Sequence, residues 1–232
     1  MLVGSWMTTD VITVRADTAM MKASIIMKER KIRCLPVVNR NGKLVGIVSD
    51  RDLKAASPSK ATALDVYELN YLISTINVEN IMTKDLVYVR PDETLEFAAI
   101  LMLENKISAL PVINPTNSLV GIVTQTDIFK ALVNITGAYA GGMQFAFSLD
   151  DRPGSIREVT DIIRDRGGRI VSVLSTREMA EEGTHHVYVR TISLPEDNLT
   201  ELLKELETRF VVLYAVKDQL DQVENRRMRI PG

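Results

Sequence analysis

Apolar and polar positions follow a fixed order along residues 7–56. Short β-rich runs flank a stretch in which small and apolar residues recur at i, i+3, i+4 and i+7, the period of one helix face. The pair Asn41-Gly42, between two of the β-rich runs, is a strong hairpin signal. In chain order the pattern predicts a strand at 11–14, a helix through 20–27, strands at 35–38 and 43–49, and a helix at 50–56. This unit is β-α-β-β-α.

The whole unit returns 75 positions later, over residues 82–131, and the alignment needs no gap. Met7-Thr8-Thr9-Asp10 returns as Met82-Thr83-Lys84-Asp85, and close to half of all paired positions are identical. A self-similar block of this kind is a duplicated structural unit. Two copies are too few for a solenoid, so we expect a pseudo-symmetric pair packed face to face, with paired clefts. The candidate helix N-caps are Asp17, Thr18, Asp92 and Thr94.

The end of each return strand carries the most informative chemistry. Residues 46–52 and 121–127 share the pattern Gly-apolar-apolar-hydroxyl-x-x-Asp at a strand-to-helix junction. A hydroxyl there is often only a helix N-cap, and the acidic residue one turn later favours the helix dipole. Alternatively, the hydroxyl and the free helix N–H groups bind a phosphate, and the carboxylate accepts two hydrogen bonds from a ribose diol. The occurrence of the pattern twice, in register, favours the functional interpretation.

These motifs resemble those of a tandem pair of CBS motifs, a Bateman module. The resemblance rests on Met-Thr-x-Asp, Leu-Pro-Val and Gly-Ile-Val-[Ser/Thr]-x-x-Asp, which occur in this order in both copies. Such modules bind adenine nucleotides or related adenosyl compounds in two clefts. The resemblance implies that Asp52 and Asp127 hold the ribose hydroxyls and that Ser49 and Thr124 contact phosphate.

The two implied clefts differ at one position beside the carboxylate. Arg51 precedes Asp52 in the first copy and would reach a phosphate, whereas the second copy has Thr126 there. The sites therefore need not be equivalent. In both clefts, backbone and apolar side chains would sandwich the base, and the residues that the resemblance implies for this role are Ile12, Ile32, Pro36, Val87, Ile107 and Pro111.

A different pattern begins after Gly141-Gly142. The expected order of elements is a strand at 143–149, a helix from 156 to about 166, strands at 170–176 and 185–193, a helix through 199–206, and a strand at 210–216. This βαββαβ order is the ferredoxin-like split topology. The turn Asp151-Arg152-Pro153-Gly154 gives the segment a resemblance to an ACT domain, a class that usually binds amino acids. The residues implied for such a site are Asp151, Pro153, Gly154, Ser155 and Ile156. The alternative is a structural dimerisation domain without a ligand.

Composition narrows the classes of function. The chain has 232 residues, enough for one large domain or two to three small ones, and its 46% hydrophobic content is ample for real cores. Its 28 Lys and Arg balance 30 Asp and Glu, which argues against nucleic acid as the main partner. No apolar run approaches the roughly 20 residues of a membrane helix, and 1–6 lacks the features of a signal peptide. Cys34, the single cysteine, is expected to be a buried, inert thiol, so we expect a cytoplasmic protein without membrane partners.

Catalytic and metal-binding motifs are missing from the sequence. It has no Ser-His-Asp or Cys-His set, no P-loop and no Gly-x-Gly-x-x-Gly fingerprint. His185 and His186 are neighbours on a predicted strand and would point to opposite faces, so they cannot easily share an ion. We therefore expect neither enzyme activity nor a metal, and no cofactor apart from the adenine nucleotide as a regulatory ligand.

Two CBS motifs followed by an ACT domain resemble the acetoin-utilisation AcuB-type family over almost the entire chain. The expected fold class is α/β (α+β), and the expected bounds are 1–60 for CBS motif 1, 61–79 for a linker helix, 80–137 for CBS motif 2, 142–219 for the ACT domain and 220–232 for a tail. The expected function is that of a non-enzymatic metabolite sensor, at least a homodimer, that binds an adenine nucleotide and a small amino acid and acts on an unidentified regulated protein. The alternative is an assembly module with vacant clefts.

Overall fold

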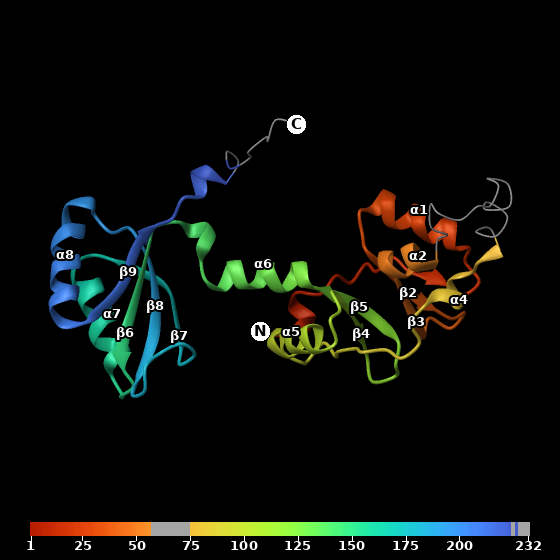
Figure 1. Cartoon of the computed structure of the whole chain (residues 1–232), viewed down its shortest axis with the longest axis horizontal. Coiled ribbons are helices and arrows are strands. Elements are labelled where there is room, and N and C mark those ends of the chain that lie inside the picture. Colours follow the sequence, from red (N-terminus) through yellow and green to blue (C-terminus); the bar gives the residue numbers. More distant parts are fainter. Residues whose placement is uncertain (57–74, 224–225, 227–232) are drawn as a thin grey trace. The chain divides into compact units, whose positions relative to one another are not determined.

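The computed structural model describes residues 1–56, 75–223 and 226, and two compact units make up the chain (Figure 1). The first unit is Met1–Phe129 and the second is Lys130–Gly232. The predicted linker helix falls mainly on residues outside the described part of the chain. Among the described residues, no helix is long and apolar enough to cross a membrane.

Each copy of the repeat folds into a β-hairpin packed against helices (Figure 1). The elements of the first copy are η1 (Val3–Ser5), β1 (Val14–Arg15), α1 (Met20–Arg30), β2 (Cys34–Val38), β3 (Leu44–Ser49) and α2 (Asp50–Ala56). Those of the second copy are α4 (Val78–Ile81), α5 (Leu95–Glu104), β4 (Ala109–Ile113), β5 (Leu119–Thr124) and α6 (Gln125–Ile135). The predicted hairpins and helices are therefore confirmed.

The first predicted strand of each copy is wrong in extent. In the first copy only Val14 and Arg15 pair, in parallel, with Val37 and Val38 of β2. In the second copy the run at 86–89 contributes a single parallel bridge between Val89 and Val112. β-branched residues suit a strand, but a strand forms only where a neighbouring strand offers unpaired backbone groups. Here the pairing with the neighbouring strand extends over two residues or fewer.

Short segments are exchanged between the two copies. Thr8, from the start of the first copy, exchanges two backbone hydrogen bonds with Ile122 in β5, with N···O distances of 2.9 and 3.0 Å. Thr83, from the start of the second copy, pairs in the same way with Ile47 in β3. Three further backbone hydrogen bonds join the first copy to the segment that leads into the second: Met20 N to Ile76 O, Val78 N to Thr18 O, and Glu79 N to Ala16 O. The three equivalent bonds join the second copy to the segment that leads into the first: Leu95 N to Met1 O, Val3 N to Glu93 O, and Gly4 N to Pro91 O. Each copy is thus completed by the segment that leads into the other.

Two glycines make room for this exchange. A Cβ atom at Gly46 would lie 3.0 Å from Cγ of Met82 and still closer to its sulfur, and a Cβ at Gly121 would meet Met7 in the same way. Contacts of this length are too close for a side chain without movement of the methionine. The Gly and Met-Thr motifs of the repeat therefore fit each other across the two copies.

The core of each copy lies between its hairpin and its helices. Met20, Met27 and Met102 are all buried there, which confirms the core role expected for these methionines. The first core also contains Val78, which precedes the second copy in sequence, so the exchanged segment contributes buried apolar surface as well as hydrogen bonds. Burial of apolar side chains is the main favourable term that holds such a pair together.

The second unit has the predicted βαββαβ order. Its elements are η2 (Ala138–Ala140), β6 (Met143–Asp150), α7 (Ser155–Asp165), β7 (Arg169–Thr176), β8 (Thr184–Ile192), α8 (Glu196–Arg209), β9 (Val211–Lys217) and η3 (Leu220–Gln222). The sheet order is β7-β8-β6-β9, with all neighbours antiparallel. Both helices cover the same face of the sheet, where Phe145 and Phe147 of β6 pack with Ile163 of α7 and Leu206 of α8. The ferredoxin-like topology is confirmed.

Candidate functional site

The junction between β3 and α2 holds a closed pair of side chains. Oδ2 of Asp52 accepts hydrogen bonds from the backbone N of Ser49 and from its Oγ, both at 2.7 Å. In return, Oγ of Ser49 lies 3.3 Å from the backbone N of Asp52. A hydroxyl before the helix and an acid in its first turn thus satisfy each other and two backbone N–H groups, as the cap interpretation expects.

The junction between β5 and α6 repeats this geometry. Oδ2 of Asp127 accepts from the backbone N of Thr124 at 2.9 Å and from its Oγ1 at 2.7 Å. Asp127 as a residue is buried, whereas Asp52 is half-buried. The cap and ligand interpretations are compatible, because an ionised carboxylate has about four acceptor positions and can accept from several donors at once.

The remaining residues implied for the adenosyl clefts are placed alike in the two copies. Pro36 and Pro111 are buried in β2 and β4, opposite Ile47 and Ile122 of the return strands. The other apolar residues of the set are half-buried: Ile12, Ile32, Val87 and Ile107. At the position that differs, Arg51 and Thr126 are both exposed in the first turn of their helices. The structure thus keeps the predicted sets at matching places in each copy.

Cys34 lies next to the first junction, paired with Ser49 across the hairpin. The residue is half-buried rather than fully buried. Burial of the thiol, and secondarily the nearby carboxylate of Asp50, raises the pKa of Cys34 to about 11. The thiol is therefore protonated at neutral pH, which agrees with the expectation that it is inert.

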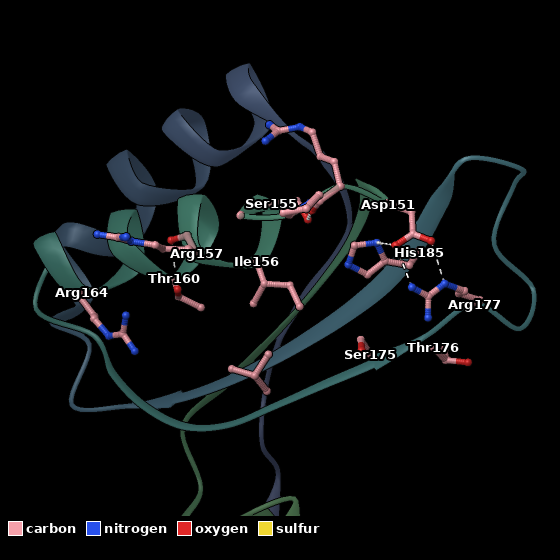
Figure 2. Close-up of a pocket in the computed structure, with 14 residues that line it drawn as sticks. Asp151, Ser155, Ile156, Arg157, Thr160, Arg164, Ser175, Thr176, Arg177 and His185 are labelled. Atoms are coloured by element: carbon pink, nitrogen blue, oxygen red, sulfur yellow. Dashed lines mark hydrogen bonds and ion pairs between the residues drawn. The ribbon is translucent and has the colours of Figure 1, made fainter.

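The second unit contains a cavity of about 720 Å³ between α7 and the edge strand β7 (Figure 2). This volume is in the range of small-molecule sites. All five residues implied for an amino-acid site line it: Asp151, Pro153, Gly154, Ser155 and Ile156. The other lining residues are Arg152, Arg157, Thr160, Arg164, Val173, Ser175, Thr176, Arg177 and His185.

The turn that opens α7 leaves the helix N-terminus without a side-chain cap. Gly154 occupies the N-cap position with φ of +93°, and no side-chain hydrogen bond caps the helix. A Cβ atom there would meet nothing within 4 Å, so glycine is present for its backbone conformation and not for lack of space. The N–H of Ser155 donates to the carbonyl oxygen of Arg152 at 3.4 Å, and the other N–H groups of the first turn are donors of the kind that bind an anionic group.

Two ion pairs frame this end of the cavity. Arg177 binds Asp151 with two hydrogen bonds of 2.7 and 2.9 Å, and this contact lowers the pKa of the Asp151 carboxyl. Arg152 binds Glu158 with two hydrogen bonds of 2.7 and 2.8 Å. Sequence reasoning missed Arg177 and His185 as cavity residues, because the pairing of β6 with β8 brings His185 to the turn and the pairing of β7 with β8 brings Arg177 there. Among the described residues, no group of His, Cys, Asp or Glu side chains has the arrangement of a metal site.

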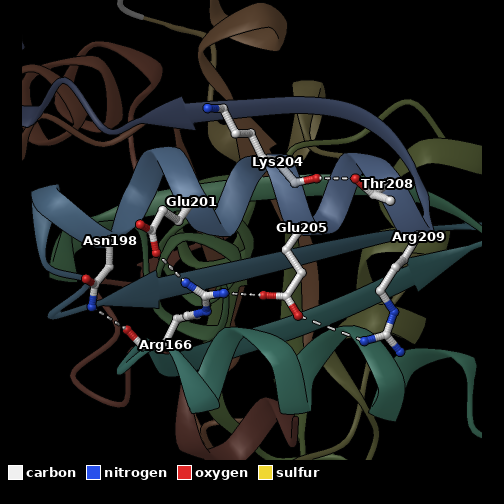
Figure 3. A network of polar contacts seen from close by, with 7 residues as sticks. All are labelled: Arg166, Asn198, Glu201, Lys204, Glu205, Thr208 and Arg209. Carbon is white, nitrogen blue, oxygen red and sulfur yellow. Dashed lines mark hydrogen bonds and ion pairs between the residues drawn. The ribbon is translucent and has the colours of Figure 1, made fainter.

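The far end of α7 is fixed to α8 by a second charged cluster (Figure 3). Arg166 donates to Glu201 and to Glu205, each at 2.8 Å, and its carbonyl oxygen accepts from Nδ2 of Asn198 at 3.3 Å. Arg209 lies 4.0 Å from Glu205. Such partly exposed pairs add modest stability, and their main effect here is to hold α7 in place beside the cavity.

Comparison with known proteins identifies the family of the first unit. The family model for the CBS domain matches residues 3–59 and 78–134. The uncharacterized protein MJ1426 of Methanocaldococcus jannaschii is 33% identical over 145 residues, which cover 53% of this chain and 86% of that protein. A homoserine O-acetyltransferase of Methanococcoides burtonii is 41% identical over 126 residues, 54% of this chain, but this chain spans only 23% of the length of that enzyme.

Solved structures agree with this assignment. CBSX2 from Arabidopsis thaliana is 34% identical with a TM-score of 0.51, over 58% of this chain and 95% of that one. CBSX2 has also been crystallised in complex with AMP. A putative acetoin utilization protein (AcuB) from Vibrio cholerae is 31% identical with a TM-score of 0.50, over 60% of this chain and 96% of that one. This chain belongs to the CBS domain family and carries a tandem CBS pair.

Proposed function

We propose that this chain is a regulatory sensor that binds adenine nucleotides, or related adenosyl compounds, in its CBS pair. The observation that carries the proposal is the pair of matching junctions, in which Asp52 and Asp127 are held by Ser49 and Thr124 at nearly identical distances. A cap alone does not require an acid in both copies, since Thr94 caps α5 by accepting from Phe97 without one. We propose no catalytic step and no cofactor.

The ligand chemistry follows from the groups at each junction. Each carboxylate would accept from the ribose hydroxyls in addition to its junction hydrogen bonds, and the junction hydroxyl would face phosphate. Arg51 would add a cationic contact to a phosphate in the first cleft, while Thr126 offers only a hydroxyl in the second. The half-buried apolar residues around Pro36 and Pro111 would hold the base. AMP is the first probe, because CBSX2 is known with AMP.

We extend the proposal to the second unit as an ACT-type domain that binds a small amino acid. Its support is the βαββαβ topology together with a cavity at the Asp151–Gly154 turn. Binding at either unit regulates a partner only if the ligand has different affinities for two states of the protein. We also propose that the protein acts in acetoin utilisation, because it is similar to the Vibrio cholerae protein.

A thermal-shift screen with AMP, ADP, ATP and S-adenosylmethionine tests the adenosyl proposal. A ligand at 100 times its dissociation constant should add about 2.7 kcal/mol to the free energy of unfolding. Asp52→Ala and Asp127→Ala should each reduce the shift. Asp50→Ala is the matched control, because Asp50 lies in the same helical turn but pairs with Lys54 on the surface. If no adenosyl compound stabilises the wild-type protein, the proposal is wrong.

A second candidate function, assembly of copies of this chain with vacant clefts, has its own support. α5 exposes a row of large apolar side chains, Phe97, Ile100 and Leu103, and α1 exposes Met21 and Ile25. Contiguous apolar surface of this kind commonly marks an interface. We propose a homodimer through these helices. Light scattering should show a dimer, and Leu103→Lys should shift it toward a monomer. A monomer at micromolar concentration, with and without AMP, would refute the dimer.

A further inference from the structure

A second, smaller cavity lies at the opposite end of the sheet from the Asp151–Gly154 turn, where β6 begins and where β8 and β9 end. Its volume is about 110 Å³. Liquid water occupies about 30 Å³ per molecule, so a space of this size takes a ligand of roughly four to six non-hydrogen atoms. The sequence motifs predict none of its described lining residues as site residues, and these are Gly142, Met143, Thr191, Ile192, Ser193, Leu194, Leu199 and Lys217.

Strand pairing places three of the lining residues in one row. Met143 of β6 is paired with Thr191 of β8 on one side and with Lys217 of β9 on the other. Residues directly opposite each other on neighbouring strands have their side chains on the same face of the sheet. Met143 packs against the core that lies under the helices. The hydroxyl of Thr191 and the ammonium group of Lys217 therefore flank Met143 on the helix-covered face, at one wall of the cavity.

The hydroxyl of Thr191 is buried without a partner. The residue is 0% exposed, and its Oγ1 makes no hydrogen bond with any described residue. A buried polar atom without a partner costs free energy, so each such atom in a folded protein needs an explanation, for example a bound molecule. Because Thr191 lines the cavity, a ligand with a hydrogen-bond acceptor would supply the missing partner.

Lys217 supplies a positive charge beside this hydroxyl. Of the described residues that line the cavity, it alone is charged. The charged residues next to this row in sequence, Arg190 and Asp218, form an ion pair with each other and add no net charge. A carboxylate can therefore pair with the ammonium group of Lys217 and accept a hydrogen bond from Thr191. Both contacts are of the stronger, charge-assisted kind.

Charges outside the lining limit the ligand to one negative charge. Glu196 and Asp197 begin α8, and Arg169 lies opposite Ile192 in β7. Two acids against one arginine leave one negative charge in excess, and the positive end of the α8 dipole offsets about half of it. Arg169 and Asp197 are exposed, so water and salt screen them. Lys217 can thus balance a monoanion, whereas a dianion such as phosphate is disfavoured.

Apolar side chains form much of the remaining wall. Met143, Leu194 and Leu199 line the cavity and also pack against the core of the second unit, and Ile192 lies beside them in the lining. Surface of this kind favours contact with an alkyl group over contact with water. The cavity therefore combines a place for one small anionic group with a place for a short apolar chain.

We infer that this cavity is a binding site for a short-chain carboxylate of the size of acetate, propionate or butyrate. The carboxylate accepts a hydrogen bond from Oγ1 of Thr191 and pairs with Nζ of Lys217, and the alkyl chain contacts Leu194 and Leu199. The inference is independent of the proposed adenosyl and amino-acid sites, because it uses none of their residues.

Methyl NMR of the wild-type protein provides the first test. Propionate, titrated at constant ionic strength, should shift the methyl signals of Thr191, Leu194 and Leu199 along a saturable curve. Propionamide has nearly the same shape without the charge and should have no such effect, and inorganic phosphate should bind more weakly than propionate. The inference is overturned if acetate, propionate and butyrate leave these signals unchanged, if propionamide binds as well as propionate, or if only Ile156 and Val173 of the larger cavity respond.

Matched variants test the two polar contacts. Thr191→Val and Lys217→Met should each weaken propionate by roughly 10- to 150-fold, the range for a lost hydrogen bond to a charged group. Thr208→Val and Lys204→Met are the controls and should bind normally, because both residues are exposed on α8 and neither is among the described lining residues. Unchanged propionate affinity in either cavity variant contradicts the inference.

The stability of Thr191→Val separates a ligand contact from a structural role. Without propionate, this variant should melt at the wild-type temperature or above it, because valine has nearly the shape of threonine and removes a buried hydroxyl that lacks a partner. A lower melting temperature together with unchanged propionate binding would show that the hydroxyl serves the fold alone. If Thr191→Val does not fold, the wild-type titration and Lys217→Met decide the question.

Discussion

The two CBS copies share their buried positions and differ on their outer helices. Ala23 and Met27 of α1 correspond to Ala98 and Met102 of α5, and all four are buried. On the outer face, Lys22 and Lys28 of the first copy are replaced by Phe97 and Leu103 in the second. Packing constrains a core position strongly, whereas an exposed position is free to change. The comparison teaches that one backbone supports two outer surfaces, since α1 exposes Met21 and Ile25 among lysines whereas α5 exposes a more apolar face.

The strand-to-helix junctions at Ser49–Asp52 and Thr124–Asp127 show the same division on a smaller scale. The hydroxyl–carboxylate pair has matching geometry in both copies, but the neighbouring residue is Arg51 in one and Thr126 in the other. The acidic residue is half-buried in the first copy and buried in the second. Equal backbones therefore support unequal charge and solvent exposure, and each difference between the copies is open to experiment.

The largest expected effect concerns the thiol that only the first copy has. Cys34 corresponds to Ala109, and burial raises the pKa of Cys34 from 9.0 to about 11. Only the thiolate reacts, so a rise of two units lowers the rate of alkylation by iodoacetamide at pH 8 by about 100-fold relative to an unshifted thiol. The rate should increase as the pH is raised toward 11. Mass spectrometry follows the reaction, and rapid alkylation of the native protein at pH 8 contradicts the prediction.

Breaking the exchanged contacts should cost the next largest amount. Gly46→Ala pushes a Cβ atom against Met82, and Gly121→Ala does so against Met7, at the same distances. Each change should lower the free energy of unfolding by about 1–3 kcal/mol, the usual cost of overpacking. The two losses should be equal if the copies are symmetric here. Urea denaturation gives both values.

A double-mutant cycle sharpens this prediction. Met82→Ala should relieve Gly46→Ala but not Gly121→Ala, and Met7→Ala should do the reverse. Rescue within one copy, for example of Gly46→Ala by Met7→Ala, is incompatible with the exchange. Gly42→Ala serves as a control for backbone strain alone, because Gly42 has φ of +74° and no atom within 4 Å of an added Cβ.

The smallest expected effect compares the starts of α1 and α5. Thr94 caps α5 by accepting from the N–H of Phe97 at 3.1 Å, whereas α1 begins after Ala19 without a side-chain cap. Thr94→Ala should cost about 1 kcal/mol, and Ala19→Thr should add about 0.5 kcal/mol if the hydroxyl adopts the same geometry. Thermal unfolding measures both. Equal and negligible effects would mean that neither cap matters in the folded unit.

Much of the fold was predictable because it depends on local periodicity. The helix through Met20 and Met27, the hairpin at Asn41-Gly42 and the βαββαβ order all follow from spacing and turn residues. The strand at 11–14 was overpredicted, because its β-branched residues say nothing about how much of a partner strand is available. β1 extends over only Val14–Arg15.

The exchange between the copies could not be predicted, and the reason is the repeat itself. The sequence does not distinguish a contact of Met7 with Gly46 from a contact of Met7 with Gly121, because the two copies carry the same motifs. Only the chain path decides between these pairings. The candidate junction residues, by contrast, are local in sequence: Ser49 and Asp52 are three residues apart, so their contact follows from the start of one helix.

His185 illustrates a different limit of sequence reasoning. It lies 34 positions after Asp151, and no motif links them. They approach because β6 and β8 are neighbours in the sheet, with Asp150 paired to Thr184. The alternation of His185 with the apolar Val187 and Val189 was the one available signal, since it indicates the face of the sheet that the helices cover.

Isothermal titration calorimetry of AMP is the most direct test of the central claim that both copies form adenosyl sites through their junction carboxylates. Wild-type protein should bind two AMP molecules per chain. Asp52→Ala and Asp127→Ala should each weaken one site by roughly 10- to 150-fold, the cost of losing hydrogen bonds to a charged group, and should leave the other site intact. The double variant should lose both sites. Unchanged affinity and stoichiometry in both single variants, with the fold intact, would contradict the claim and leave the two carboxylates as helix caps.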